Sequence, residues 1–224
     1  MILLNWKANG SPKLVEEYNA LNITPHQMTV MSPMHLISML DSSKYNIGTQ
    51  DVSTFLNGSY TGEVTAEMLS CINVKFCLVG HSERRHYLGE DNKAIATKIE
   101  HLLANNITPV LCVGENSLDR ANQSQFEILK QQMDVFTENC IIAYEPVWAI
   151  GTGSTPTNHE IDDVSYWLKQ QYEGISCVPK VLYGGSVSAK NIQELHKAQI
   201  DGILVGKASL DISQVLEISK YLPM

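Results

Sequence analysis

The amino-acid sequence predicts an α/β fold, a closed (β/α)8 barrel that forms a single domain over residues 1–224. Eight short apolar runs alternate along the chain with segments whose apolar residues recur at helical spacing. The runs are almost entirely apolar, which is typical of parallel strands covered on both faces. Each strand–helix unit has roughly 28 residues, fewer than in the usual barrel of about 250 residues, so we expect shortened loops and helices.

The apolar runs predict the strands. They lie at residues 2–6, 27–31, 45–49, 76–79, 110–113, 141–144, 181–183 and 203–205. A doubly wound open sheet also alternates strands with helices, but it usually has fewer strands in one domain. The periodicity therefore favours the barrel and leaves the open sheet as the alternative.

Three of the intervening segments show amphipathic helical spacing most clearly. Start and stop signals agree with it: Ser11-Pro12 places proline at a first helical position, Thr157 and Glu160 have the spacing of a capping box, and Asn106 provides a stop. The spacing runs through Ile95, Ile99, Leu102 and Leu103, through Phe126, Leu129, Met133 and Phe136, and through Ile161, Val164, Leu168 and Tyr172.

The chain is acidic, with 16 Lys and Arg residues against 24 Asp and Glu residues and a net charge of −8. Binding to a phosphate backbone needs a basic face, so we expect no nucleic-acid partner. A small anion can still bind to such a protein in a locally positive pocket. The apolar stretches are at most about five residues long, far short of the roughly 20 that a membrane span requires, so we expect no membrane partner.

The cysteines and the first residues bear on location. Cys71, Cys77, Cys112, Cys140 and Cys177 lie beside apolar residues without C-x-x-C spacing, and we interpret them as buried thiols in a reducing compartment. The start of the sequence has no basic leader and no small-residue cleavage site. We therefore expect a cytoplasmic protein.

Polar residues gather where the predicted strands end. Lys7 follows the first strand, His81 the fourth and Glu145 the sixth. Because the carboxyl ends of all strands in such a barrel face one mouth, these three side chains should meet there. A lysine, a histidine and a carboxylate together suit the abstraction of a proton next to a carbonyl group.

Each of these residues also has a simpler interpretation. Lys7 alone could be a solvated charge, and His81 could cap the helix that follows it. Glu145 follows an apolar run and precedes proline, so we expect it to be buried. A buried carboxylate needs a hydrogen-bonding or charged partner, or it has a functional role. We expect ion pairs that orient the site from the charged residues near His81, which are Glu83, Arg84, Arg85 and Glu90.

Glycines follow the sixth and seventh strands at Gly151, Gly153, Gly184 and Gly185. They could simply form tight turns, but loops seven and eight of a barrel also hold phosphate through backbone N–H groups. The spacing of the histidines does not suit a helical zinc pair, and no nucleotide motif is complete. We expect neither a metal nor a cofactor.

Four segments carry a resemblance to a known family. Residues 5–9 (NWKAN), 80–85 (GHSERR), 143–153 (AYEPVWAIGTG) and 183–187 (YGGSV) resemble, in this order, the motifs of the triosephosphate isomerase family. The resemblance runs from Asn5 to Leu210, nearly the whole chain. It implies a (β/α)8 TIM barrel that interconverts glyceraldehyde 3-phosphate and dihydroxyacetone phosphate through an enediolate, in glycolysis and gluconeogenesis, with this triose phosphate as the small-molecule partner.

The resemblance also implies catalytic roles. Glu145 would be the base that moves the proton, His81 would polarise the carbonyl as a neutral imidazole, and Lys7 would supply fixed positive charge. Asn5 would position the substrate or Lys7, and Glu83 would support the site. Residues 146–153 resemble the family's mobile lid, whose closure would exclude water.

For the substrate phosphate, the resemblance implies backbone N–H donors at Gly151, Ser186, Gly206 and Lys207. The sequence departs from the family here, since a second glycine usually follows Gly206 and Lys207 stands in its place. A lysine at positive φ would carry strain on the order of 1 kcal/mol, so we expect a negative φ at Lys207.

Residues 57–63 resemble the family's interdigitating third loop, in which Thr61 would insert near Asn5 and Lys7 of a second subunit. A homodimer follows from this resemblance. Two rival functions stay open: another phosphate-binding barrel enzyme, such as an epimerase or a synthase acting on a phosphorylated sugar, and a catalytically silent barrel that only binds a partner.

Overall fold

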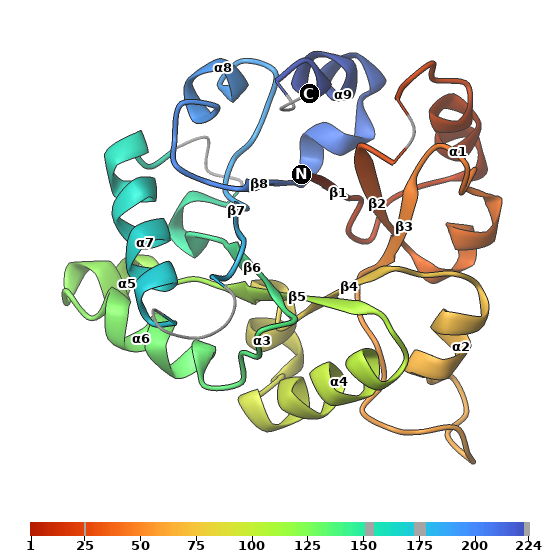
Figure 1. The fold of residues 1–224 in the computed structure, drawn as a ribbon, viewed down its shortest axis with the longest axis horizontal. Helices are drawn as coiled ribbons and strands as arrows, with labels where there is room; N and C mark the ends of the chain where they lie inside the picture. The colour runs from red at the N-terminus through yellow and green to blue at the C-terminus, as the bar shows by residue number, and fades with distance from the viewer. Residues whose placement is uncertain (25, 151–154, 173–177, 222–224) are drawn as a thin grey trace.

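The computed structural model describes residues 1–224 apart from residue 25 and residues 151–154, 173–177 and 222–224 (Figure 1). Eight parallel strands form a closed barrel in sequence order, with the first strand also paired to the eighth. This confirms the predicted barrel and excludes the open sheet. The strands are β1 (Ile2–Asn5), β2 (Met28–Ser32), β3 (Asn46–Thr49), β4 (Phe76–Val79), β5 (Thr108–Val113), β6 (Ile141–Tyr144), β7 (Val181–Tyr183) and β8 (Gly202–Val205).

Helices surround the barrel (Figure 1). The α-helices are α1 (Pro12–Asn19), α2 (Ala66–Cys71), α3 (Ser82–Leu88), α4 (Asn92–Ala104), α5 (Ser117–Ala121), α6 (Gln125–Met133), α7 (Asn158–Gln170), α8 (Ile192–Leu195) and α9 (Ile212–Ser219), and the 3-10 helices are η1 (Met34–Met39), η2 (Val147–Ala149) and η3 (Lys207–Leu210).

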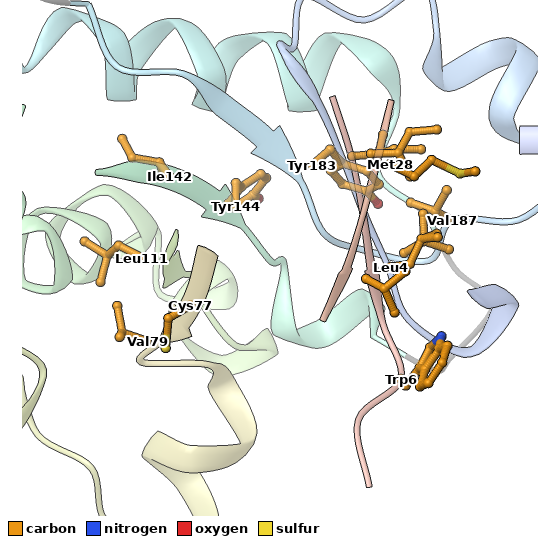
Figure 2. Packing of buried hydrophobic residues seen from close by; sticks show 14 of the residues in the cluster. Leu4, Trp6, Met28, Cys77, Val79, Leu111, Ile142, Tyr144, Tyr183 and Val187 are labelled. Atoms are coloured by element: carbon orange, nitrogen blue, oxygen red, sulfur yellow. The ribbon is translucent and has the colours of Figure 1, made fainter. Parts of the chain in front are cut away.

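Strand alternation divides the core into two layers. One layer fills the barrel itself, while the other lies between the strands and the helices. Figure 2 shows side chains of this outer layer, among them Leu4, Ile142 and Tyr183. The interior layer consists of Leu3, Met31, Leu78, Val110, Cys112, Ile141, Ala143, Leu182 and Leu204.

The predicted helix signals act as expected. Pro12 is the first residue of α1, and the Ser11 hydroxyl accepts a hydrogen bond from the Leu14 N–H. Thr157 and Glu160 form a reciprocal capping box at the start of α7. Asn106, just past α4, has φ 57°, the left-handed conformation common after a helix.

Some elements are shorter than the spacing suggests. α6 ends at Met133, so Phe136 lies beyond it and instead packs its ring against Tyr172 at 4.4 Å between centroids. The connection from β2 to β3 is made by the 3-10 helix η1, and α8 has 4 residues. The shortening therefore falls on the outer layer.

The cysteine expectation is partly wrong. Cys77, Cys112 and Cys140 are buried free thiols, Cys71 is exposed, and Cys177 lies outside the described residues. Cys71 ends α2, whose buried face is made by Ala66 and Leu69 one turn apart, so its own side chain lies off that face. No helix in the described part of the chain is long and apolar enough to cross a membrane.

Candidate active site

The alternation of β6 directs Glu145 into the barrel mouth. Ile141 and Ala143 belong to the interior layer, so Glu145, two residues further on, lies on the same side. Its side chain is buried, as expected. Gly184, after β7, leaves room for it, because a Cβ atom at that position would lie 2.8 Å from Glu145 Cγ.

His81 follows β4 and caps the next helix, which was the simpler interpretation of this residue. It is the N-cap of α3, and its Nδ1 accepts a hydrogen bond from the Glu83 N–H at 3.3 Å. On the other side of the ring, Nε2 lies 3.1 Å from Glu145 Oε1. A nitrogen that accepts a hydrogen bond carries no proton, so the neutral ring has its proton on Nε2, the atom that faces Glu145.

Opposing effects set the pKa of His81. Burial lowers the pKa, but the nearby Glu145 carboxylate raises it by more, so that it lies above its ordinary value. The Glu83 N–H acts against this rise, because its hydrogen bond exists only while Nδ1 is unprotonated.

Lys7 extends from the end of β1 in a strained conformation. Its φ is 52°, which is uncommon for a residue with a side chain. The Lys7 N–H donates to Asn5 Oδ1 at 3.0 Å, and the Lys7 carbonyl accepts from Gln50 Nε2 at 2.8 Å. Its ammonium group forms an ion pair with Glu83 at 2.5 Å. The neighbours of Lys7 therefore hold its cation beside α3.

The site contains buried polar atoms whose hydrogen-bonding capacity is not fully used by the described residues. Glu145 Oε2 is buried and has no hydrogen-bond partner among the residues that the structure describes, and His81 Nε2 has none there besides the nearby Glu145 Oε1. Buried polar atoms are rarely left in this state, and in a mouth between strands they are available to a ligand.

A cavity of about 580 Å³ opens beside His81, and Glu145 is not among the residues that line it. Four predicted residues, Asn5, Lys7, His81 and Glu83, line it, together with Gln50. Its volume falls in the range of small-molecule sites.

The expected ion pairs near His81 form, with one exception. Arg84 pairs with Asp51 at 2.6 Å and with Glu90 at 3.3 Å, and the buried Lys98 joins both carboxylates. Arg85 has no carboxylate partner in the described residues and instead donates to the Gly80 carbonyl at 2.8 Å. The network ties α3, which carries Glu83 and begins next to His81, to β3 and α4.

Three of the four predicted phosphate donors follow the ends of two neighbouring strands, Ser186 after β7 and Gly206 and Lys207 after β8. At Gly206 a Cβ atom would lie 3.6 Å from Lys7 Cε, so the end of β8 is close to Lys7. Ser186 Oγ donates to the Ala149 carbonyl at 2.8 Å. Lys207 is exposed, begins η3 and is not among the residues with positive φ, as expected. Gly151 and Gly153 lie outside the described residues.

Thr61 is exposed. It does not line the cavity of its own chain, although its neighbours Gly62 and Glu63 do. This is the arrangement expected if Thr61 serves a second subunit.

Sequence reasoning missed several residues of the site. Gln50 and Asp51 directly follow β3 and could have been found by the same strand-end argument. Glu115, two residues past the end of β5, could have been found in the same way. Arg120 carried no such signal, because its contacts with Trp148 and Glu160 join residues far apart along the chain.

Fold and site together define a (β/α)8 barrel with a buried imidazole–carboxylate pair at the carboxyl ends of its strands. The family model described as "Triosephosphate isomerase" matches residues 1–222. The triosephosphate isomerase of Orientia tsutsugamushi (strain Ikeda) is 37% identical over 241 residues, covering 98% of this chain and 96% of that protein. That of Alkaliphilus metalliredigens is 35% identical over 242 residues, covering 97% of each. The chain belongs to the triosephosphate isomerase family, a family of isomerases.

Proposed function

We propose that this protein interconverts glyceraldehyde 3-phosphate and dihydroxyacetone phosphate, with Glu145, His81 and Lys7 as its catalytic residues. The observation that carries the proposal is the pair formed by His81 Nε2 and Glu145 Oε1, 3.1 Å apart, buried, and located in the barrel mouth. The curated relatives bear the name of this enzyme.

Glu145 takes a proton from the carbon next to the substrate carbonyl. The electrons of the broken C–H bond form the C=C bond of an enediolate, and the carbonyl oxygen becomes negative. The hydroxyl proton on the carbon that lost its hydrogen moves to this oxygen, and Glu145 returns its proton to the former carbonyl carbon, which gives the other triose phosphate. Atoms balance without an external reactant.

His81 and Lys7 stabilise the charge that develops on oxygen. A neutral His81 with its proton on Nε2 donates a hydrogen bond to that oxygen, while the Lys7 ammonium group supplies fixed positive charge. Asn5 positions Lys7 through the bond from the Lys7 N–H to Asn5 Oδ1. Glu83 supports both, through its N–H on His81 and its carboxylate on Lys7.

The phosphate group is held by backbone N–H groups of Gly151, Ser186, Gly206 and Lys207. A dianion is repelled by the net charge of −8, so these donors and Lys7 must act at close range. The resemblance assigns a lid to residues 146–153, of which 151–153 lie outside the described residues. Its closure would exclude water and protect the enediolate from loss of its phosphate.

A coupled assay with glyceraldehyde 3-phosphate tests the activity. Glu145→Gln removes the base and should lower kcat by about 10²–10⁴-fold. The matched control is Glu217→Gln on α9, which loses only an exposed ion pair with Lys220 and should keep full activity. Equal activity in wild type and Glu145→Gln would refute the proposed function.

We also propose a homodimer in which Thr61 of the second subunit enters the cavity. In support, the loop around Thr61 exposes Leu56 and the stacked rings of Phe55 and Tyr60, whose centroids are 4.0 Å apart. A cytoplasmic location remains a prediction of the sequence.

A further inference from the structure

The peptide group that joins Val113 to Gly114, at the end of β5, contacts the backbone of the catalytic base. The Val113 carbonyl accepts a hydrogen bond from the Glu145 N–H at 2.7 Å. A Cβ atom at Gly114 would lie 1.7 Å from the Glu145 carbonyl oxygen, so the two backbones touch and only glycine fits at this position. The orientation of this one peptide group therefore determines where the backbone of Glu145 lies.

A glutamine side chain holds the other side of Gly114. Gln132, near the end of α6, accepts a hydrogen bond from the Gly114 N–H through Oε1 at 2.7 Å, and its Nε2 donates to the Gly114 carbonyl at 3.0 Å. The pairing of β5 with β4 ends at Leu111, three residues before Gly114. The amide of Gln132 thus supplies the donor and the acceptor that a neighbouring strand supplies elsewhere in the barrel.

The planarity of the peptide bond connects these contacts. The Gly114 N–H and the Val113 carbonyl belong to one rigid group and point in opposite directions. Gln132 Oε1 binds one end of this group and the Glu145 N–H binds the other, both at 2.7 Å. A rotation of the peptide group would therefore weaken both bonds together, and hydrogen bonds in such a row strengthen one another.

We propose that Gln132 is a positioning residue for the catalytic base: its amide fixes the peptide group between Val113 and Gly114, which fixes the backbone of Glu145. The inference rests on the proposed function, in which Glu145 moves the proton. Gln132 acts at a distance, because both of its hydrogen bonds are to Gly114. Proton transfer depends strongly on distance, so a small displacement of Glu145 should lower kcat more than it changes KM.

The first variant is Gln132→Met, which keeps the length of the side chain and removes both hydrogen bonds. It should lower kcat by about 10-fold, with KM within about twofold because the groups proposed to hold the phosphate are unchanged. The matched control is Gln131→Met. Gln131 is the neighbouring residue on α6 and is exposed, so this variant should keep the wild-type kcat.

The second variant, Gln132→Glu, restores the hydrogen bonds only while it is protonated. A protonated carboxyl group has one acceptor and one donor, like the amide, whereas a carboxylate only accepts and would face the Gly114 carbonyl. This contact should raise the pKa of the new carboxyl group above its ordinary value of about 4.3. We expect the kcat of Gln132→Glu, divided by that of Gln131→Glu at the same pH, to be close to one at low pH and to fall by about 10-fold as the carboxyl group ionises.

His81 gives a readout that does not depend on turnover. The Glu145 carboxylate, 3.1 Å from His81 Nε2, raises the pKa of the imidazole. If Gln132→Met displaces Glu145, the pKa of His81 should be lower in this variant than in wild type or in Gln131→Met. NMR titration of the imidazole measures the difference.

A folded Gln132→Met protein with the wild-type kcat and the wild-type His81 titration would overturn the inference, even if its melting temperature fell. If Gln132→Met does not fold, a kcat ratio of one at every pH in Gln132→Glu would have the same meaning. An inactive wild type would refute the proposed function instead, and the His81 titration would then decide whether Gln132 positions Glu145.

Discussion

At the scale of single residues, the site consists of side chains that are held on one side and available on the other. His81 accepts a hydrogen bond from the Glu83 N–H through Nδ1, which leaves Nε2 facing Glu145. Lys7 is fixed by backbone contacts to Asn5 and Gln50, which leaves its ammonium group near Glu83 at the cavity. Such two-sided residues give preorganised charges, because the holding contacts are already made before substrate binds.

The strained backbone of Lys7 gives a first prediction. Lys7→Gly and Lys7→Ala both remove the ammonium group and should both lower kcat by at least about 100-fold. The glycine variant should be the more stable by roughly 0.5–1 kcal/mol, the left-handed penalty less the extra chain entropy that glycine loses on folding. Urea unfolding measures the difference, and equal or reversed stabilities would show that φ 52° carries no strain.

The pKa of His81 gives a second prediction. In Glu145→Gln the carboxylate that raises this pKa is absent while burial remains, so the pKa should fall. NMR titration of the imidazole, assigned with His81→Gln, measures the change. A titration at the same pH in both proteins would contradict the Glu145–His81 coupling.

The same pKa has a consequence for stability. In wild type the pKa of His81 is higher in the folded protein than in the unfolded chain. Protonation of His81 therefore stabilises the fold, and this stabilisation is complete at pH values below the pKa of the unfolded chain. That stabilisation is lost as pH rises through the folded pKa. The corresponding loss should be absent in Glu145→Gln, and unfolding at several pH values would show it.

At the scale of elements, the alternation of side chains along the strands and the starts of the helices determine where the side chains of the site lie. Leu3, Ala143, Leu182 and Leu204 fill the barrel. The residues two positions further along their strands, which include Asn5 and Glu145, therefore surround the mouth. The strands determine which way the side chains at their ends point. The start of α3 at His81 provides the hydrogen bond that orients its imidazole.

Gly184 tests this placement. A methyl group in Gly184→Ala would lie 2.8 Å from Glu145 Cγ, so the carboxylate must shift. We expect kcat to fall by about 10²-fold with a smaller effect on KM.

Gly202→Ala is the control for this substitution. At the start of β8 a Cβ atom would lie 2.2 Å from the Met1 carbonyl oxygen, so that variant should lose stability while its folded fraction keeps kcat. Wild-type turnover in Gly184→Ala would mean that the glycine is not needed for Glu145.

At the scale of the whole molecule, closure of the barrel makes the site. Asn5, His81 and Glu145 are separated by more than 60 residues at each step along the sequence, yet they come from β1, β4 and β6 of one ring. No shorter part of the chain contains the mouth, because β1 must pair with β8 to close it.

The proposed dimer gives the prediction at this scale. Deleting residues 59–61 removes Thr61 and the Tyr60 ring that stacks on Phe55. The product should be a monomer with very low turnover, since the second subunit no longer completes the cavity. Ultracentrifugation and the coupled assay measure the two properties, and a fully active monomer would contradict the dimer proposal.

The sequence by itself determined the strands, the helix starts and the residues at the barrel mouth. All three depend on local chemistry: apolar runs form covered strands, Ser11-Pro12 and Thr157 with Glu160 begin helices, and strand ends face one way in a parallel barrel. His81 and Glu145 could be chosen on these grounds.

Only the tertiary structure decided which charges meet. Lys98 joins Asp51 and Glu90, and Arg120 joins Glu115 to Glu160, although the sequence gives no spacing rule for either set. The exposure of Cys71 was likewise set by how α2 packs. The physical reason is that an ion pair or a buried face depends on distances between elements, and these exist only once the barrel has closed.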